Sequence, residues 1–189
     1  MNLPNGLTLF RVVLVPVFIL FFYPLGVDER TYWGAGWVFA IAAITDFFDG
    51  YIARRYGLVT RLGKLLDPIA DKVLVTAALV MLVEVHRVAG WIAIVILGRE
   101  FAVTGLRALA ASEGVVLAAE SLGKWKVGAQ ITAILMLLAD HIWFVPLIPF
   151  RPMGTFFLWV SMVLAVISGL QYGVGYWRGG VATGSDVRG

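Results

Sequence analysis

Residues 46–71 read DFFDGYIARRYGLVTRLGKLLDPIAD. This acidic stretch holds four aspartates at the ends of two long apolar runs: Asp46, Asp49, Asp67 and Asp71. Charged groups at membrane depth are costly, so such residues indicate a functional site. The first two are three residues apart and the last two are four apart, so each pair lies on one face of a helix. If the two helices are antiparallel neighbours, all four carboxylates converge.

The four carboxylates need compensation for their charge, because like charges close together raise each other's pKa. Divalent cations are the expected compensation, since carboxylate oxygens suit hard ions such as Mg²⁺ or Mn²⁺. Two such ions in one site can hold a diphosphate and polarise its phosphorus. The alternative interpretation is that the acids are solvated at two helix ends joined by a basic loop.

The spacing of the stretch is D-x2-D-G-x2-A-R-x8-G-x3-D-x3-D. This pattern resembles the signature of the CDP-alcohol phosphotransferase family, and all eight fixed positions match: Asp46, Asp49, Gly50, Ala53, Arg54, Gly63, Asp67 and Asp71. The opening LPNGLTLFR over residues 3–11, and the segment from Arg99 to Gln130, are similar to the phosphatidylglycerophosphate synthase branch of that family. The resemblance therefore spans nearly the whole chain, although the signature itself does not choose the acceptor alcohol.

The composition is that of an integral membrane protein. The 189 residues are 60% hydrophobic with a mean hydropathy of +0.89, whereas ordinary soluble domains are roughly 45–50% apolar. We predict an all-α membrane protein with a single domain over residues 1–178 and a disordered, Gly-rich tail over residues 179–189. The net charge of +3 is better explained by a positive-inside bias than by nucleic-acid binding. The absence of cysteine excludes disulfides and thiol chemistry.

Six apolar segments, each close to the roughly 20 residues that a spanning helix needs, follow one another along the chain. They lie near Leu7–Tyr23, Tyr32–Ile52, Leu65–Val85, Trp91–Ala110, Trp125–Phe144 and Thr155–Trp177. A short interfacial helix is expected before the first, beginning at Asn5 and Thr8. The first segment lacks a small-residue cleavage site, so we expect it to be retained.

The loop charges predict the orientation of these segments. One side carries Arg54, Arg55, Arg61, Lys64, Arg107, Lys124, Lys126, Arg178 and Arg188. The other carries Arg30, Arg87 and Arg151, mixed with Asp28, Glu29, Glu84 and Asp140. The first side is therefore expected to be cytoplasmic. The protein is expected to lie in a bacterial-type inner membrane with both termini on the cytoplasmic side. This orientation places the acidic stretch at the cytoplasmic boundary of the membrane.

Residues beside the aspartates offer contacts to a nucleotide diphosphate. Gly50 has no Cβ and permits close approach of a ligand or a neighbouring helix. The guanidinium of Arg54 can make two parallel hydrogen bonds to a diphosphate. Alternatively, the side chain can extend to the membrane surface and serve as an anchor. Thr60 offers a hydroxyl in the loop. Asp67 precedes Pro68, which fits the first turn of a helix and equally a longer helix kinked at Pro68.

A second group of charges lies in the fourth and fifth segments. Arg99 and Arg107 are eight residues apart and share a broad face of one helix. Together with Lys124 they are expected to form a basic pocket for a second phosphate group beside the acidic stretch. The alternative is deep ion pairing, for example between Arg99 and an acid on another helix.

The resemblance implies that the enzyme transfers the phosphatidyl group of CDP-diacylglycerol to sn-glycerol 3-phosphate, giving phosphatidylglycerol phosphate and CMP. It implies two divalent cations held by the four aspartates, with Asp71 as the general base. It also implies that Asn5, Thr8, Gly50, Arg54 and Thr60 hold the CDP group, and that the protein is a homodimer. Two alternatives stay open: another acceptor (inositol phosphate, serine or a phosphatidyl lipid) or a cation or proton transporter. The near absence of polar residues in the outer halves of the segments weighs against transport.

Overall fold

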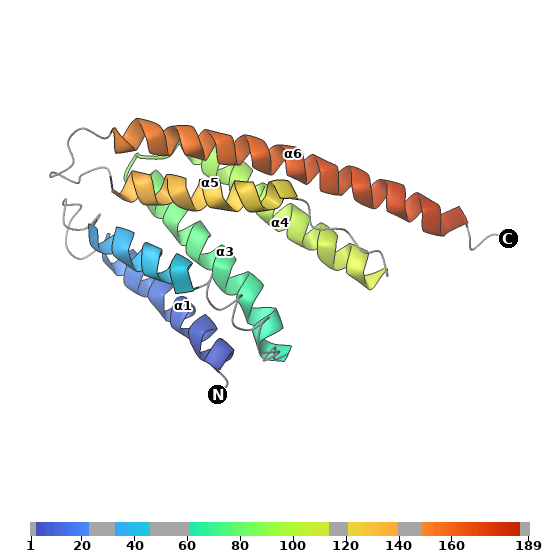
Figure 1. Ribbon diagram of the computed structural model, residues 1–189, viewed down its shortest axis with the longest axis horizontal. Coiled ribbons are helices and arrows are strands. Elements are labelled where there is room, and N and C mark those ends of the chain that lie inside the picture. The colour runs from blue at the N-terminus through green and yellow to red at the C-terminus, as the bar shows by residue number, and fades with distance from the viewer. Residues whose placement is uncertain (1–2, 23–32, 46–60, 114–120, 140–148, 186–189) are drawn as a thin grey trace. The chain divides into compact units, whose positions relative to one another are not determined.

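The computed structural model describes residues 3–22, 33–45, 61–113, 121–139 and 149–185 (Figure 1). Within these residues the chain forms six helices, which confirms the predicted all-α fold for the described part. They are α1 (Leu3–Leu20), a helix over residues 33–45, α3 (Arg61–Glu84), α4 (Gly90–Ser112), α5 (Ser121–Leu138) and α6 (Phe150–Ser185).

Two helix ends differ from the sequence-based expectation. α1 runs from Leu3 to Leu20 without a break, so the N-terminal residues and the first apolar segment form one helix rather than two. α6 continues to Ser185, into the Gly-rich tail for which the composition predicts disorder. Both differences have one physical reason: extending an existing helix costs less than nucleating a new one. The single domain expected over residues 1–178 stays a prediction.

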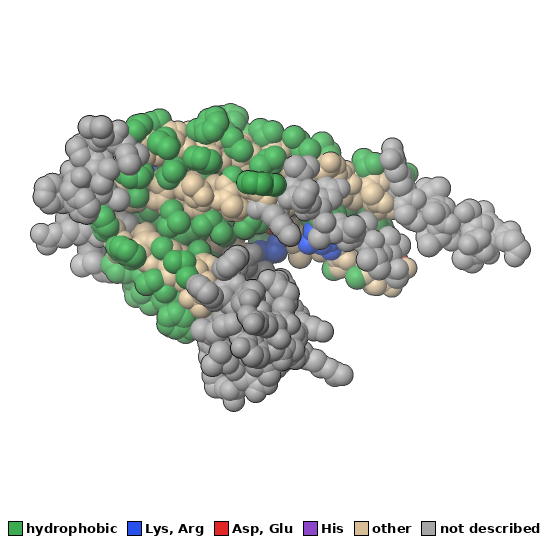
Figure 2. Space-filling view, in the orientation of Figure 1, with side chains coloured by type: hydrophobic (Ala, Val, Ile, Leu, Met, Phe, Trp, Pro, Cys, Tyr) green, Lys and Arg blue, Asp and Glu red, His purple; other side chains and the backbone are tan. Residues whose placement is uncertain are grey.

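The described helices vary in length and apolar content. Phe150–Trp177 is long and apolar enough to cross a membrane, with a mean hydropathy of 2.0. Phe10–Leu20, Trp33–Thr45 and Trp125–Leu138 are shorter apolar helices. On the face seen in Figure 2, hydrophobic side chains (green) cover much of the surface of the described residues. The described residues therefore hold one helix that meets the requirements of a span and three shorter apolar helices.

The chain divides into two compact units. Unit 1 comprises residues 1–88 and 133–155, and unit 2 comprises residues 89–132 and 156–189. In unit 1, α1 packs against α3. The buried face of α1 is a stripe at helical spacing: Arg11, Val15 and Phe18, followed by Phe22 just beyond the helix. The Phe18 ring lies 5.3 Å from that of Phe22 and 6.3 Å from that of Phe39, measured between centroids.

The C-terminal end of α3 is closed by a left-handed residue. His86 has φ of 56°, the Arg87 amide donates to the Leu82 carbonyl at 2.9 Å, and the His86 amide donates to the Val83 carbonyl at 3.0 Å. This is the hydrogen-bond pattern of a Schellman cap, with histidine where glycine is usual. His86 therefore ends a helix.

In unit 2, α4 and α6 pack along their lengths. The buried residues of α6 recur every three or four positions: Leu158, Ser161, Ala165, Ser168 and Tyr172. At one end the rings of Trp91 and Trp159 meet edge to face, with centroids 5.2 Å apart. At the other end the Tyr176 hydroxyl donates to Glu113 Oε2 at 2.7 Å. Because the contacts follow the same order along both helices, α4 and α6 run parallel.

Candidate functional site

The predicted site residues differ in how far the structure describes them. Five of them, Asp46, Asp49, Gly50, Arg54 and Thr60, lie outside the described residues. For Asn5, Thr8, Asp67, Asp71 and Lys124 the structure gives the helix that carries them but no side-chain surroundings. Arg99 and Arg107 are described in full.

Asp67 and Asp71 lie on α3, which begins at Arg61. A helix that begins near Asp67 is therefore wrong, and the longer helix through Pro68 is confirmed; a kink at this proline stays a prediction. Six residues before Asp67 already belong to the helix, and the apolar residues among them extend its pattern. Because four residues make about one turn, Asp67 and Asp71 lie on one face of α3.

The N-terminal candidates are carried by the helix that packs against α3. Asn5 and Thr8 belong to the first turns of α1. Figure 1 shows α1 and α3 starting at the same end of unit 1, so both pairs of candidates lie toward that end. Arg11, one turn beyond Thr8, is 1% exposed. This arginine therefore belongs to the interior of unit 1, where a guanidinium is costly unless its charge is compensated.

Arg99 is anchored to α6 and to its own helix. Its Nε donates to the Ala165 carbonyl at 2.8 Å, and its Nη2 donates to Ser168 Oγ. Its Nη1 lies 3.4 Å from Glu100 Oε1. The side chain is 12% exposed, and a Cβ added at Gly169 would lie 3.1 Å from Arg99 Cγ. All three guanidinium nitrogens therefore have partners in the protein.

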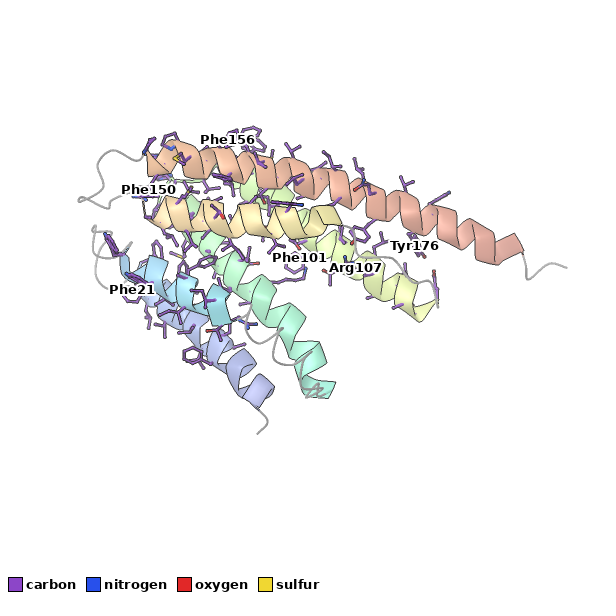
Figure 3. All side chains as sticks on the ribbon, viewed as in Figure 1. Phe21, Phe101, Arg107, Phe150, Phe156 and Tyr176 are labelled. Atoms are coloured by element: carbon purple, nitrogen blue, oxygen red, sulfur yellow. The ribbon has the colours of Figure 1, made fainter. Side chains whose placement is uncertain are left out.

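Arg107 has a more open setting on the same helix. Its Nη2 donates to the Tyr172 hydroxyl, and its Cζ lies 4.5 Å from the centroid of the Tyr172 ring. Arg107 is exposed and Tyr172 is 4% exposed. Figure 3 labels Arg107 on α4 and Tyr176 on α6. We call the polar contacts between these two helices the α4–α6 seam. Its residues are Arg99 and Arg107 on α4, Glu113 directly after α4, and Ser168, Tyr172 and Tyr176 on α6.

An ion pair joins α5 to the seam. Lys126 Nζ pairs with Glu100 Oε1, the same oxygen that faces Arg99, and Lys126 is 2% exposed. Arg99 and Lys126 therefore share one carboxylate oxygen of Glu100 in a largely buried setting. Ion pairing of Arg99, which the sequence leaves open, is thus present, but the acid is its neighbour Glu100 and not a residue of another helix.

Four partners in unit 2 were not predicted from the sequence: Glu100, Lys126, Ser168 and Tyr172. One signal was available, because a charged residue within an apolar segment must find a partner. That rule marks Glu100 and Lys126, but it does not say which side chain each one meets. Nothing in the chain around Ser168 and Tyr172 distinguishes them from other polar residues of an apolar helix.

Unit 2 also carries an apolar groove of about 710 Å³ between α5 and α6. Its lining residues are Trp125, Gly128, Ala129, Thr132, Phe157, Val160 and Leu164. Such a lining cannot compensate a phosphate, so the polar chemistry of this unit belongs to the seam. Among the described residues, no three acidic or histidine side chains lie close enough together to hold a metal ion. The side chains of the four aspartates are not among those described.

Comparison with known proteins extends over most of the chain. Residues 1–167 match the sequence model of a family described as CDP-alcohol phosphatidyltransferase. Relatives named CDP-diacylglycerol–glycerol-3-phosphate 3-phosphatidyltransferase occur in several bacteria. The Bacillus subtilis (strain 168) protein is 44% identical over 181 residues, which cover 90% of this chain and 93% of the relative. The Rickettsia bellii protein is 41% identical, with 90% and 93% covered, and the Escherichia coli K12 protein is 41% identical, with 90% and 92% covered.

Proposed function

Because the chain belongs to the CDP-alcohol phosphatidyltransferase family, we propose that it transfers the phosphatidyl group of CDP-diacylglycerol to sn-glycerol 3-phosphate. The observation that carries this proposal is the similarity to relatives named for that reaction, at 41–44% identity over nine tenths of the chain. The C1 hydroxyl oxygen of glycerol 3-phosphate attacks the β-phosphorus, and the bond from that phosphorus to CMP breaks. The products are phosphatidylglycerol phosphate and CMP.

The acidic stretch fits a site for divalent cations. Asp67 and Asp71 share a face of α3, and carboxylates one turn apart are a donor set that hard cations accept. We assign Asp46, Asp49, Asp67 and Asp71 as the residues that hold two ions, Mg²⁺ or Mn²⁺. When bound, such ions neutralise the diphosphate and stabilise the departing CMP.

Asp71 is the proposed general base. Its carboxylate accepts the proton of the attacking hydroxyl as the new oxygen–phosphorus bond forms. Asp71 lies one turn further into α3 than Asp67. This position supports a role for Asp71 beside the acceptor alcohol and a role for Asp67 beside the diphosphate.

The CDP group is proposed to contact Gly50, Arg54, Thr60, Asn5 and Thr8. The packing of α1 against α3 supports the inclusion of the two N-terminal residues, because both helices start at the same end of unit 1 (Figure 1). A guanidinium such as that of Arg54 makes two parallel hydrogen bonds to phosphate oxygens, which fixes orientation as well as charge.

The phosphate of the acceptor is proposed to bind the basic residues of unit 2. Arg107 is exposed and has donors beyond the one given to Tyr172, which supports its role as a direct contact. Lys124 is proposed as a second contact. Arg99 has three partners in the protein, which supports a role in holding α4 against α6 near the phosphate; a direct contact from Arg99 stays a prediction.

We further propose six membrane spans, with both termini and the site on the cytoplasmic side of an inner membrane. The parallel course of α4 and α6, with α5 between them in sequence, supports three successive crossings of alternating direction. The polar contacts of the seam extend from Arg99 toward the C-terminal end of α4, and the opposite end is the Trp91–Trp159 contact. That pattern supports a site at one boundary and not a transport path. The homodimer stays a prediction.

The test is CMP release by the purified full chain, supplied with CDP-diacylglycerol and Mg²⁺ or Mn²⁺. Glycerol 3-phosphate, inositol phosphate, serine and a phosphatidyl lipid are compared as acceptors at matched concentrations. We expect release with glycerol 3-phosphate and little with the others. Release that is faster with another acceptor would change the proposed substrate, and no release with any of them would remove the proposed reaction.

A further inference from the structure

The only exposed member of the arginine pair on α4 is held by one aromatic residue of α6. Tyr172 places its ring 4.5 Å from Arg107 Cζ and accepts a hydrogen bond from Arg107 Nη2 through its hydroxyl. The ring itself is buried, at 4% exposure, on the inward stripe of α6 that also carries Ser168 one turn earlier. A buried ring in a packed helix is a rigid support for a long, flexible side chain.

This support fixes an arginine without using up its donors. A guanidinium carries five N–H groups in a planar fork. Stacking on a ring face fixes the plane of the fork, and one hydrogen bond fixes its rotation within that plane. Among the described residues, Tyr172 is the one hydrogen-bond acceptor of Arg107, so other N–H groups remain to meet a ligand. Arg99 differs, because all three of its nitrogens have protein partners.

We propose that Tyr172 is a positioning residue for the acceptor phosphate and acts through Arg107. The proposal rests on the proposed function, in which Arg107 contacts the phosphate of glycerol 3-phosphate. Holding a long side chain in its binding orientation before the ligand arrives removes an ordering cost from binding. Tyr172 therefore lowers the KM for the phosphorylated acceptor and leaves the chemical step alone.

The first test compares Tyr172→Phe and Tyr172→Ala with the wild-type full chain. The phenylalanine variant keeps the ring and loses the hydroxyl, so we expect the KM for glycerol 3-phosphate to rise about two- to tenfold. The alanine variant loses both contacts, and the rise should be larger. The kcat and the KM for CDP-diacylglycerol should stay within about twofold of wild type, since neither depends on the orientation of Arg107.

Tyr176→Phe is the matched control. Tyr176 lies one turn further along α6 and gives its hydroxyl to Glu113, not to Arg107. Removing that hydroxyl should leave both KM values unchanged. An equal rise in the KM for glycerol 3-phosphate in Tyr172→Phe and Tyr176→Phe would attribute the effect to general loosening of α6, and would overturn the proposal.

A double-mutant cycle shows whether the effect passes through Arg107. In an Arg107→Ala background, Tyr172→Phe should add nothing to the KM for glycerol 3-phosphate, because there is no guanidinium left to position. Additive effects, or an unchanged KM in Tyr172→Phe alone, would overturn the proposal; the phenylalanine variant decides this even if the alanine variant does not fold. A wild-type chain that turns over a different acceptor only would instead refute the proposed function, and with it the premise of this inference.

Discussion

The acidic stretch and the α4–α6 seam differ in how their charged groups find partners. Asp67 and Asp71 are one turn apart on a single helix, so their proximity follows from the chain itself. In the seam, Arg99 and Ser168 are 69 residues apart, and Arg107 and Tyr172 are 65 apart. Local spacing thus brings together the two members of such an aspartate pair, whereas the contacts of the seam depend on how two helices pack.

The largest effect on CMP release is expected when the divalent cations proposed for the acidic stretch are removed. Exhaustive chelation should reduce CMP release to background, because uncompensated carboxylates repel the diphosphate. Adding back Mg²⁺ or Mn²⁺ should restore it. Asp46→Asn and Asp67→Asn should lose metal-dependent binding of CDP-diacylglycerol, measured by titration. Full turnover after chelation would show that the acidic stretch needs no metal.

The next effect separates the proposed base from the other aspartates. Asp71→Asn keeps the shape and one coordinating oxygen but cannot accept the proton, so kcat should fall about 10²–10⁴-fold. Binding of CDP-diacylglycerol should fall far less, because three carboxylates remain. Raising the pH should restore little, since the attacking alcohol ionises far above any usable pH. A near-normal kcat, or loss of both metal and CDP-diacylglycerol binding, would remove Asp71 from this role.

A smaller effect on catalysis is expected when one of the basic residues of unit 2 is replaced. Arg107→Ala and Lys124→Ala should raise the KM for glycerol 3-phosphate about tenfold to a hundredfold, because a charge-assisted hydrogen bond contributes roughly 1.5–3 kcal/mol. The KM for CDP-diacylglycerol should change much less. Steady-state kinetics with each substrate varied in turn give both values. An equal rise in both would indicate general structural damage.

The smallest effect on turnover is expected at Arg99, which sharpens the contrast between the two arginines of α4. Arg99→Met removes donors to the Ala165 carbonyl and Ser168, so the melting temperature of the purified protein should fall by several degrees. The KM for glycerol 3-phosphate should change less than about threefold. Arg107→Met is the matched variant and should show the reverse pattern. If Arg99→Met raises that KM as much as Arg107→Met does, Arg99 contacts the phosphate directly.

Parts of the fold and site could be predicted because they depend on short spacing or on composition. The apolar segments predict helices, and six are present in the described residues. The spacing of the aspartates and the glycines between them indicates the family, and the match over residues 1–167 confirms it. The spacing of eight positions from Arg99 to Arg107 predicts a shared face, and both side chains do contact α6.

Other features were decided by the tertiary structure. Glu100 pairs with both Arg99 and Lys126, and the other partners of the two arginines come from α6. No local pattern could select these partners, because the spacing within a helix sets which face a residue occupies but not which helix packs there. A charged side chain in an apolar segment must be compensated. The sequence by itself therefore determined that partners were needed, and only the packing of α4 against α5 and α6 decided which they were.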